Sequence, residues 1–328
     1  MYRSGFKIIK KLNLQKGIVI KSTGSWYQVR LKNEEEWKCR IMGKFRLDGM
    51  KVTNPVAVGD EVQIEIESKV EGTAIIRKIL PRRNYVIRQS PRKKHFLHLL
   101  AANVDQAIVI VTVIEPLLKQ GFIDRFLLMT EPYNIPTVIV FNKADLYKED
   151  EMAMFDYMKA IYENIGYTVV LVSATEDIGK EKFREVLKDK ITLVAGQSGV
   201  GKSTLVNAIQ PQLNLRAFEL SDYSGKGQHT TTFAEMFQLD FGGAIIDSPG
   251  IKTLGFNHLK PMDVVHNFRE IFKVSHGCKF SNCTHRNEPH CAVKEAVEKG
   301  EISELRFINY LQLLDEIEDQ NYWERHKG

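Results

Sequence analysis

The chain has 328 residues, 43% of them hydrophobic and 27% charged, an ordinary balance for a globular protein of two or three domains. No run of eighteen apolar residues occurs, which argues against a transmembrane helix. The first residues also lack the apolar core and cleavage site of a secretory signal. We therefore expect a cytoplasmic protein with no membrane partner, and take a monomer as the default state.

The net charge of +5 is unevenly distributed along the chain. Residues 1–100 contain 22 lysines and arginines against 9 acidic residues, whereas the other 228 residues contain 24 against 32. A basic first third favours a polyanionic partner, most simply nucleic acid. A solvated surface that is basic without binding anything explains the same charge, so this observation leaves both interpretations open.

Short strand-like segments recur every 8–14 residues between residues 16 and 80, with turn residues between them. This spacing predicts a small closed β-barrel. Five strands fit an OB-fold, although a barrel of another topology fits the pattern nearly as well. Residues 81–95 contain two prolines and are rich in Lys and Arg, which is typical of a basic linker.

A different rhythm begins near residue 100. Continuous apolar runs (QAIVIVTV, TVIVF, TVVLV and ITLVA) alternate with helix-length segments at 119–132, 150–164 and 179–188. This alternation predicts a parallel sheet covered by helices on both faces, with two further strands at 233–239 and 243–247. Residues 261–328 are expected to be helical, with one cluster of cysteines and histidines.

These patterns predict a multidomain protein. Residues 1–85 would form an RNA-binding β-barrel followed by a basic linker to about residue 98. Residues 99–256 would form an α/β nucleotide-binding domain. Residues 257–328 would form a mostly helical metal-binding domain.

The segment GQSGVGKST at 196–204 matches the phosphate-binding motif G-x-x-x-x-G-K-[ST] and lies between a strand-like run and a plausible helix. Its glycines let backbone N–H groups converge on phosphate oxygens, and the helix adds its positive end. Lys202 is expected to reach the β- and γ-phosphates, and Ser203 to ligate Mg²⁺. The loop comprises Gly196, Gln197, Ser198, Gly199, Val200, Gly201, Lys202, Ser203 and Thr204.

The segment FNKADL at 141–146 ends another buried strand and carries the N-K-x-D element of GTPases, comprising Asn142, Lys143, Ala144 and Asp145. Asp145 can accept two hydrogen bonds from guanine, and adenine offers no matching donors, so GTP and GDP are the expected ligands. Asn142 can meet guanine O6 and tie the strand to the phosphate loop, while the stem of Lys143 covers the base. Ser173 and Ala174 are expected to support the base from behind.

Two further elements are expected to respond to the γ-phosphate. Asp247, in AIIDSPG, can hold Mg²⁺ through water, and the N–H of Gly250 can meet the phosphate. Among the threonines of GKGQHTTT, we favour Thr231 as a magnesium ligand. Ordinary small GTPases place a water-orienting Gln at the position of Ile251, so intrinsic hydrolysis should be slow. His229 is the local candidate for positioning water, although a contact with RNA or a place on a mobile loop would also account for it.

The elements occur in the order base, base support, phosphate, switch, switch, which is that of a circularly permuted GTPase domain. Joining neighbouring ends of the ordinary domain and cutting it elsewhere preserves the sheet. The chain then enters the C-terminal domain directly after Gly250. Movement of that switch on hydrolysis would therefore pull on the C-terminal domain.

Three cysteines lie within fourteen residues in CKFSNCTHRNEPHC, which in a cytosolic chain indicates metal rather than disulfides. Three thiolates and one imidazole make a closed tetrahedral zinc set, as in a structural site. His290 is a rival to His285, but it adjoins Cys291 and would strain the chelate. Cys39 has no assignable role. The expected zinc ligands are Cys278, Cys283, His285 and Cys291.

Together, VGDEV, FNKADL, GQSGVGKSTL, GKGQHTTT, DSPGI and the Cys/His cluster resemble the circularly permuted, ribosome-small-subunit-dependent GTPases of bacteria, from about residue 15 to 300. The resemblance implies an OB-fold, a GTPase centre and a C-terminal zinc domain. It also implies binding to the 30S subunit and its 16S rRNA, a role late in subunit maturation, and GTPase activity stimulated by the subunit. His229 resembles the histidine at the same place in the family. The family's pattern of zinc ligands favours His285.

Other functions remain open at this stage. Ile251 permits an RNA-binding assembly chaperone in which GTP is mainly a structural or regulatory ligand. An ATP-using enzyme conflicts with Asp145, and a translation-elongation role lacks the further domains of such factors. Trp26 and Tyr27 could stack on RNA bases, although the core is the commoner place for such aromatic residues.

Overall fold

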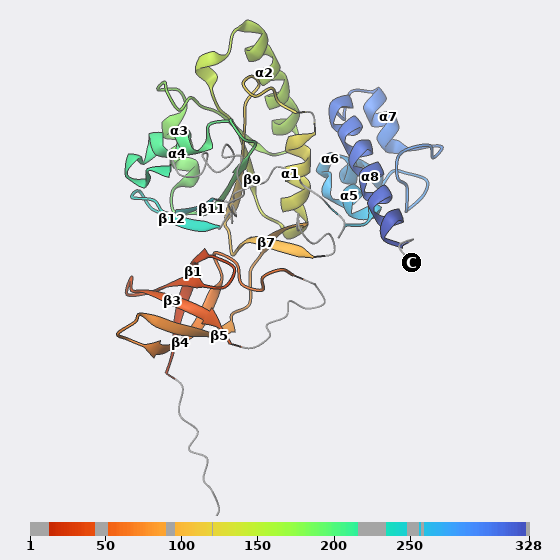
Figure 1. The fold of residues 1–328 in the computed structure, drawn as a ribbon. Coiled ribbons are helices and arrows are strands. Elements are labelled where there is room, and N and C mark those ends of the chain that lie inside the picture. Colours follow the sequence, from red (N-terminus) through yellow and green to blue (C-terminus); the bar gives the residue numbers. More distant parts are fainter. Residues whose placement is uncertain are drawn as a thin grey trace, which may run out of the picture.

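The computed structural model describes residues 13–42, 52–89, 96–119, 121–215, 234–247, 256 and 259–325. Figure 1 shows a barrel at one end of the molecule, a central sheet flanked by helices, and a group of helices beside α1. Where the chain is described, no helix is both long and apolar enough to cross a bilayer.

The N-terminal barrel has the strand order β1-β2-β3-β5-β4, and β1 also pairs with β4, which closes it. Strands β3 and β5 are parallel, and the other neighbours are antiparallel. This is a closed five-stranded barrel of OB-fold type, as predicted. Apolar residues at alternate positions fill its interior. The strands are β1 (Leu14–Ser22), β2 (Tyr27–Leu31), β3 (Glu36–Ile41), β4 (Glu61–Ser68) and β5 (Thr73–Ile79).

The predicted linker is wrong in part, because residues 85–89 form a strand, while residues 90–95 lie outside the described part of the chain. Strand β6 (Tyr85–Gln89) pairs antiparallel with β7 (Leu97–Ala102), which the sequence analysis missed. Prolines and basic residues dominate the composition here, but Val86 and Ile87 are buried, and that burial stabilises the strand. The division into three domains at the expected limits stays a prediction.

The central sheet has the order β10-β9-β8-β11-β13-β12, with all neighbours parallel except β12 and β13. Side chains alternate between its two faces, so Ile139 contacts the core under α1 and α2, whereas Val138 and Val140 contact the core under α3 and α4. The predicted sheet covered on both faces is confirmed. Its strands are β8 (Gln106–Val111), β9 (Thr137–Phe141), β10 (Thr168–Leu171), β11 (Ile191–Gly196), β12 (Glu235–Gln238) and β13 (Ala244–Asp247).

Helices connect these strands much as the sequence predicts. The bounds are α1 (Phe122–Thr130), α2 (Glu149–Asn164), α3 (Lys180–Leu187) and α4 (Lys202–Ile209), with short 3-10 turns η1 (Glu131–Tyr133), η2 (Ala144–Leu146) and η3 (Pro211–Leu213). The C-terminal part is helical, with α5 (Pro261–Asn267), α6 (Arg269–Ser275), α7 (Ala292–Glu298) and α8 (Glu304–Arg325).

The barrel continues the central sheet through strand β12. Lys21 of β1 lies opposite Glu235 of β12, and their side chains form an ion pair of 2.7 Å. The Ser22 N–H donates to the Ala234 carbonyl at 3.3 Å. The strand that closes one edge of the central domain is therefore also a neighbour of the barrel.

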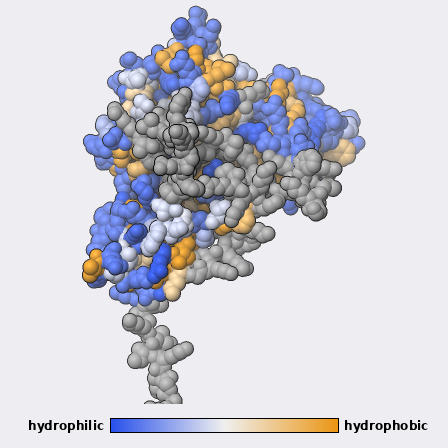
Figure 2. Space-filling view, in the orientation of Figure 1, coloured by the Kyte–Doolittle hydropathy of each residue, from blue (hydrophilic) through white to orange (hydrophobic). Residues whose placement is uncertain are grey.

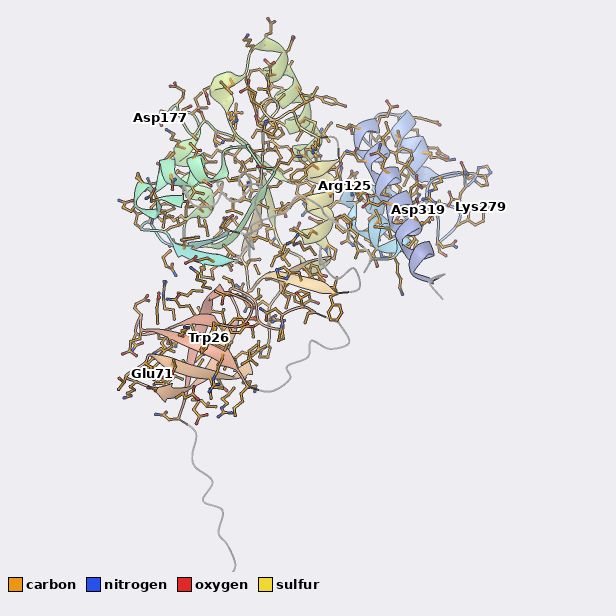
Figure 3. All side chains as sticks on the ribbon, in the orientation of Figure 1. Trp26, Glu71, Arg125, Asp177, Lys279 and Asp319 are labelled. Atoms are coloured by element: carbon orange, nitrogen blue, oxygen red, sulfur yellow. The ribbon has the colours of Figure 1, made fainter. Side chains whose placement is uncertain are left out.

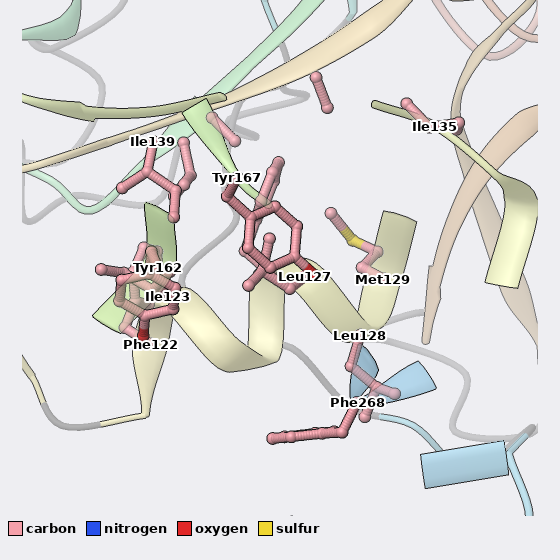
Figure 4. Packing of buried hydrophobic residues seen from close by; sticks show 14 of the residues in the cluster. Phe122, Ile123, Leu127, Leu128, Met129, Ile135, Ile139, Tyr162, Tyr167 and Phe268 are labelled. Carbon is pink, nitrogen blue, oxygen red and sulfur yellow. The ribbon is translucent and has the colours of Figure 1, made fainter. Parts of the chain in front are cut away.

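The C-terminal helices are joined to α1 by a buried ionic cluster. Arg306 of α8 is only 2% exposed and pairs with Asp124 of α1, which is fully buried. The same guanidinium donates twice to Glu270 of α6, at 2.7 and 3.0 Å. Figure 4 shows Phe268 among the hydrophobic residues packed beside α1. Removing one partner would leave an uncompensated buried charge, which generally costs about 3–5 kcal/mol.

His98 should make the stability of the chain depend on pH. Burial, and next the charge of Arg88 opposite it, lower the pKa of His98 from 6.5 to about 4, and its Nδ1 lies 3.0 Å from Thr53 Oγ1. Between pH 7 and 5 the imidazole protonates in the unfolded chain but stays neutral when folded. The free energy of unfolding should therefore fall by about 2 kcal/mol over that range.

Urea unfolding at pH 7 and pH 5 tests this contribution. In His98→Gln, whose amide retains hydrogen-bonding capacity toward Thr53, the fall should be smaller by about that amount. An equal fall in both proteins would show that His98 does not contribute.

Candidate nucleotide site and metal centre

The parallel strands bring the nucleotide motifs together at one edge of the sheet. Strand β8 lies between β9 and β11, and β13 lies on the other side of β11. Because these strands are parallel, their carboxyl ends meet at the same edge. The loops after Phe141 and Gly196 are thus neighbours, and Asp247 ends its strand at the same edge, although the chain order is permuted.

The phosphate-binding segment forms a tight turn between β11 and α4. Gly199 and Gly201 have φ values of 83° and 85°, in the left-handed region that favours glycine. A β-carbon on Gly201 would lie 2.6 Å from Asn142 Nδ2. The turn comprises Gln197, Ser198, Gly199, Val200 and Gly201, and Lys202, Ser203 and Thr204 form the first turn of α4.

Lys202 lies over the phosphate-binding loop. Its Nζ donates to the carbonyls of Gly196 at 3.1 Å and Gln197 at 3.0 Å. The ammonium is therefore held at the mouth of the loop, where a phosphate oxygen would be a stronger, charge-assisted partner.

Asn142 links the two loops directly. Its side chain is buried, and Nδ2 donates to the Val200 carbonyl at 2.8 Å across 58 residues of sequence. Its Oδ1 is buried and has no partner within the described part of the chain. The expected tie between the N-K-x-D strand and the phosphate loop is present in this geometry.

Tyr147, which the sequence analysis missed, braces the same strand end. Its hydroxyl accepts from the Val113 N–H at 2.9 Å and donates to the Asn142 carbonyl at 2.9 Å. Lys143 has a φ of 65°, and its Nζ donates to the Glu115 carbonyl. The N-K-x-D loop is thus bonded to the loop that follows β8. A tyrosine two residues after N-K-x-D has no special pattern, so only the fold reveals this role.

Asp145 is exposed and ready to accept from a base. Burial tends to raise the pKa of its carboxyl, but hydrogen bonds from Ser173 and Thr175, together with the charge of Lys143, bring the pKa below its usual value. The Ser173 hydroxyl donates to Asp145 Oδ1 and lies 3.0 Å from Thr175 Oγ1. The ionised form, which a guanine edge requires, is therefore favoured. Thr175 is a second residue that the sequence analysis missed, although it directly follows the expected Ser173 and Ala174.

Ala144 and Ala174 complete the two base-side loops. The Ala144 N–H donates to the Val172 carbonyl at 3.1 Å, which joins the loop after β9 to the loop after β10. Ala174 follows Ser173 and is partly buried.

Asp247 ends β13, beside Val194 of the strand that leads into the phosphate loop. Burial raises the pKa of its carboxyl to about 6, while the charge of Lys202 acts in the opposite direction. A cation at this position would favour the ionised form. His229, Thr231, Gly250 and Ile251 lie outside the described residues, so their expected roles stay predictions.

The cysteine cluster has the geometry of a tetrahedral metal site. The four ligand atoms of Cys278, Cys283, His285 and Cys291 all lie within 4.8 Å of one another. Contacts within the set measure 3.3–3.9 Å, close to the separations of about 3.5–3.8 Å around a tetrahedral ion with three sulfur ligands and one nitrogen ligand.

The same distances exclude disulfides, because bonded sulfurs lie about 2.05 Å apart. His290 is exposed and lies outside the group. Burial, the largest cause, raises the pKa of the Cys283 thiol to about 12. A bound cation would favour the thiolate form of this group.

Comparisons with known proteins agree with this geometry. Residues 79–257 match the family model described as RsgA GTPase, and residues 16–74 match the RsgA N-terminal domain. The chain belongs to the RsgA GTPase family. It is a GTPase, and the resemblance inferred from its motifs is confirmed.

Relatives and solved structures extend over nearly the whole chain. The small ribosomal subunit biogenesis GTPase RsgA 2 of Bacteroides thetaiotaomicron is 51% identical over 94% of this chain and 98% of its own length. RsgA of Flavobacterium psychrophilum is 46% identical, over 93% of this chain and 94% of its own.

Two crystal structures share the fold. YjeQ from Thermotoga maritima has a TM-score of 0.73 and 37% identity, and covers 93% of this chain and 98% of its own. YloQ, described as a circularly permuted GTPase, has a TM-score of 0.69 and 29% identity, and covers 97% of this chain and 99% of its own. The circular permutation inferred from motif order is thereby confirmed.

Metal removal should destabilise the C-terminal helices first, because the cysteine cluster lies between α6 and α7. We expect a strong chelator under reducing conditions to lower the thermal midpoint of that part of the chain by several degrees or more. Differential scanning calorimetry with and without chelator measures the effect. Cys39→Ser is the control for thiols outside the cluster: it removes the buried barrel thiol, and the chelator should act on it as on the unmodified chain. An unchanged profile after verified metal loss would contradict a structural metal site.

Proposed function

We propose that this chain is a GTP-hydrolysing factor of small ribosomal subunit biogenesis, which binds the 30S subunit and its 16S rRNA and acts late in maturation. The Asn142 bond to Val200 carries the proposal, because it holds a base-reading loop against a phosphate loop. The names of relatives that match over more than nine-tenths of the chain supply the partner. A cytoplasmic monomer is the form in which we expect it to act.

In this proposal each motif has a defined task. Asp145 reads guanine, with Ser173 orienting its carboxylate, and Lys202 and the loop N–H groups bind the β- and γ-phosphates. Ser203 and Thr231 ligate Mg²⁺, and Asp247 holds it through water. His229 positions the attacking water in place of the Gln that Ile251 replaces, and the 30S subunit completes the catalytic arrangement.

Zinc is the ion that we assign to the cysteine cluster. Three sulfurs and one imidazole suit zinc, and a closed four-ligand set leaves no position for substrate, so the ion would be structural. When bound, it would contribute to folding a segment of the chain that has little core of its own.

The residues that contact RNA can be placed more narrowly than the whole basic first third of the chain. The described barrel, residues 13–42 and 52–80, contains nine basic and eight acidic residues and is nearly neutral. Arg82 and Arg83 pair with Asp60 and Asp105. The excess of positive charge therefore belongs mainly to residues 1–12, 43–51 and 90–95. We assign the phosphate contacts to these segments.

Of the two aromatic residues considered for base stacking, one remains a candidate. Tyr27 is 2% exposed and forms part of the barrel core, so it is excluded. Trp26, labelled in Figure 3, is 37% exposed in the β1–β2 loop. Lys38 Nζ lies 4.6 Å from the centroid of its ring. That loop is one by which OB-folds bind oligonucleotides.

Stimulation by the subunit is the decisive test. Phosphate release from GTP should rise by several orders of magnitude when purified 30S subunits are added, because they complete the arrangement that Ile251 leaves incomplete; completed GTPase sites gain up to about 10⁵. ATP with the same subunits is the control and should give no release. If GTP binds tightly without any stimulation, the alternative of an RNA-binding chaperone with a structural nucleotide replaces this proposal.

Replacing the carboxylate of Asp145 should change which base the protein prefers. In Asp145→Asn the amide no longer matches the two guanine donors but can donate to the 2-oxo group of xanthine. GTP affinity should fall on the order of 100-fold, and affinity for xanthosine triphosphate should rise.

Fluorescence titration with both nucleotides measures the exchange. Asp177→Asn is the matched control, since this exposed acid lies on the loop after Ser173 (Figure 3) and should leave both affinities unchanged. Retained GTP preference in Asp145→Asn would refute the assignment.

A further inference from the structure

A separate pocket lies between the central domain and the C-terminal helices. The loop after β8, helix α2 and the start of α8 enclose a space of about 430 Å³. That volume is typical of cavities that bind one small molecule. The phosphate loop takes no part in its walls. The walls are mainly apolar and include Ile114, Leu117, Leu118, Met154, Met158 and Leu305.

One buried polar atom at the wall of this pocket lacks a partner. Asn309 is 2% exposed, and its Nδ2 donates to Asp124 Oδ2. A carboxylate only accepts, so this bond fixes the orientation of the amide. Asn309 Oδ1 then has no partner in the described structure, and it would lie 3.5 Å from a β-carbon built on Gly121, another wall residue.

The other buried polar group at the wall is already satisfied. The Tyr162 hydroxyl donates to Asp124 Oδ1 at 2.7 Å, which leaves its ring as apolar wall. Figure 4 shows Tyr162 close to Ile123 at the start of α1, and both residues line the pocket. Among the buried side chains of the described wall, Asn309 Oδ1 is thus the unsatisfied acceptor, and its surroundings are mainly apolar.

The rim indicates an accessible pocket that does not select charge. Leu117 is 76% exposed and Met154 47%, and Figure 2 shows hydrophobic surface over the region of α2. Methionine side chains adapt easily to flat ring systems. Lys119, Asp150 and Glu151 bring both signs of charge to the rim, so an ionised ligand gains little.

We propose that this pocket binds a neutral, small aromatic molecule whose one ring N–H or O–H group donates to Asn309 Oδ1. The ring fills the space between Leu118 and Met158. Indole has this chemistry and serves as the probe.

Binding in this pocket should change the nucleotide affinity, because two hydrogen bonds connect the pocket wall to the nucleotide site. Val113, a wall residue, donates to Tyr147, whose hydroxyl donates to the Asn142 carbonyl. The Glu115 carbonyl of the same loop accepts from Lys143. Binding in the pocket is independent of the proposed function, and only this coupling rests on it.

Calorimetric titration of the full, metal-loaded chain with indole tests the site. Saturable binding is expected, and 1-methylindole, which has a similar shape but lacks the donor, should bind about tenfold more weakly. Equal affinity for the two compounds, or no saturable binding of indole, would overturn the proposal.

Two matched variants locate the site. Met154→Trp fills the pocket and should weaken indole binding at least about tenfold. Tyr157→Trp makes a similar change at an exposed position on the same helix that does not line the pocket, and should leave binding unchanged. Both positions are exposed, and thermal melts verify that each variant folds. Undiminished binding in Met154→Trp would place indole elsewhere and overturn the assignment.

The coupling has its own readout. Saturating indole should change the affinity for fluorescent GDP at least about threefold in the unmodified chain and not in Met154→Trp. A constant affinity with indole bound would overturn the coupling alone. Failure to bind GDP without indole would instead contradict the proposed function.

Discussion

Hydrogen bonding between the parallel strands β9, β8, β11 and β13 is the constraint on which the rest of the structure depends. It fixes the carboxyl ends of these strands at one edge, whatever their order along the chain. The permutation changes only the order in which the chain passes through these strands. The side chain of Asn142 then links two loops that lie far apart in sequence. Chemistry that needs a base-reading carboxylate near a phosphate loop therefore survives the rearrangement.

The two flanking parts of the chain are attached in different ways. The barrel joins through backbone pairing and the surface ion pair of Lys21 with Glu235, an interaction that water and salt weaken. The C-terminal helices join through the buried guanidinium of Arg306, which water does not screen. Motion of the barrel against the central sheet should therefore cost less than motion of the helices against α1. The idea that movement of the second switch pulls on the C-terminal part stays a prediction, because residues 248–255 lie outside the described part of the chain.

The sequence predicted the elements whose signal is local. Continuous apolar runs identified the buried strands, and glycines with a lysine identified the phosphate loop. It missed β7, because LHLLAA is as typical of a helix and becomes a strand only by pairing with β6. It also missed Tyr147 and Thr175, whose roles depend on hydrogen bonds with the distant residues Val113 and Asp145. The charge count over residues 1–100 overstated the basicity of the barrel, because most of the positive excess belongs to residues 1–12, 43–51 and 90–95, outside its described strands.

The seam between β1 and β12 has a practical consequence for dissecting the protein. A fragment that lacks the barrel would leave β12 as an open edge, with unpaired N–H and C=O groups along a strand that normally has a neighbour. Such an edge invites pairing with another copy, so self-association of the fragment could be mistaken for a native dimer. Fragments made to isolate the nucleotide chemistry should therefore retain β1, or carry a charged or proline residue on β12 that blocks pairing.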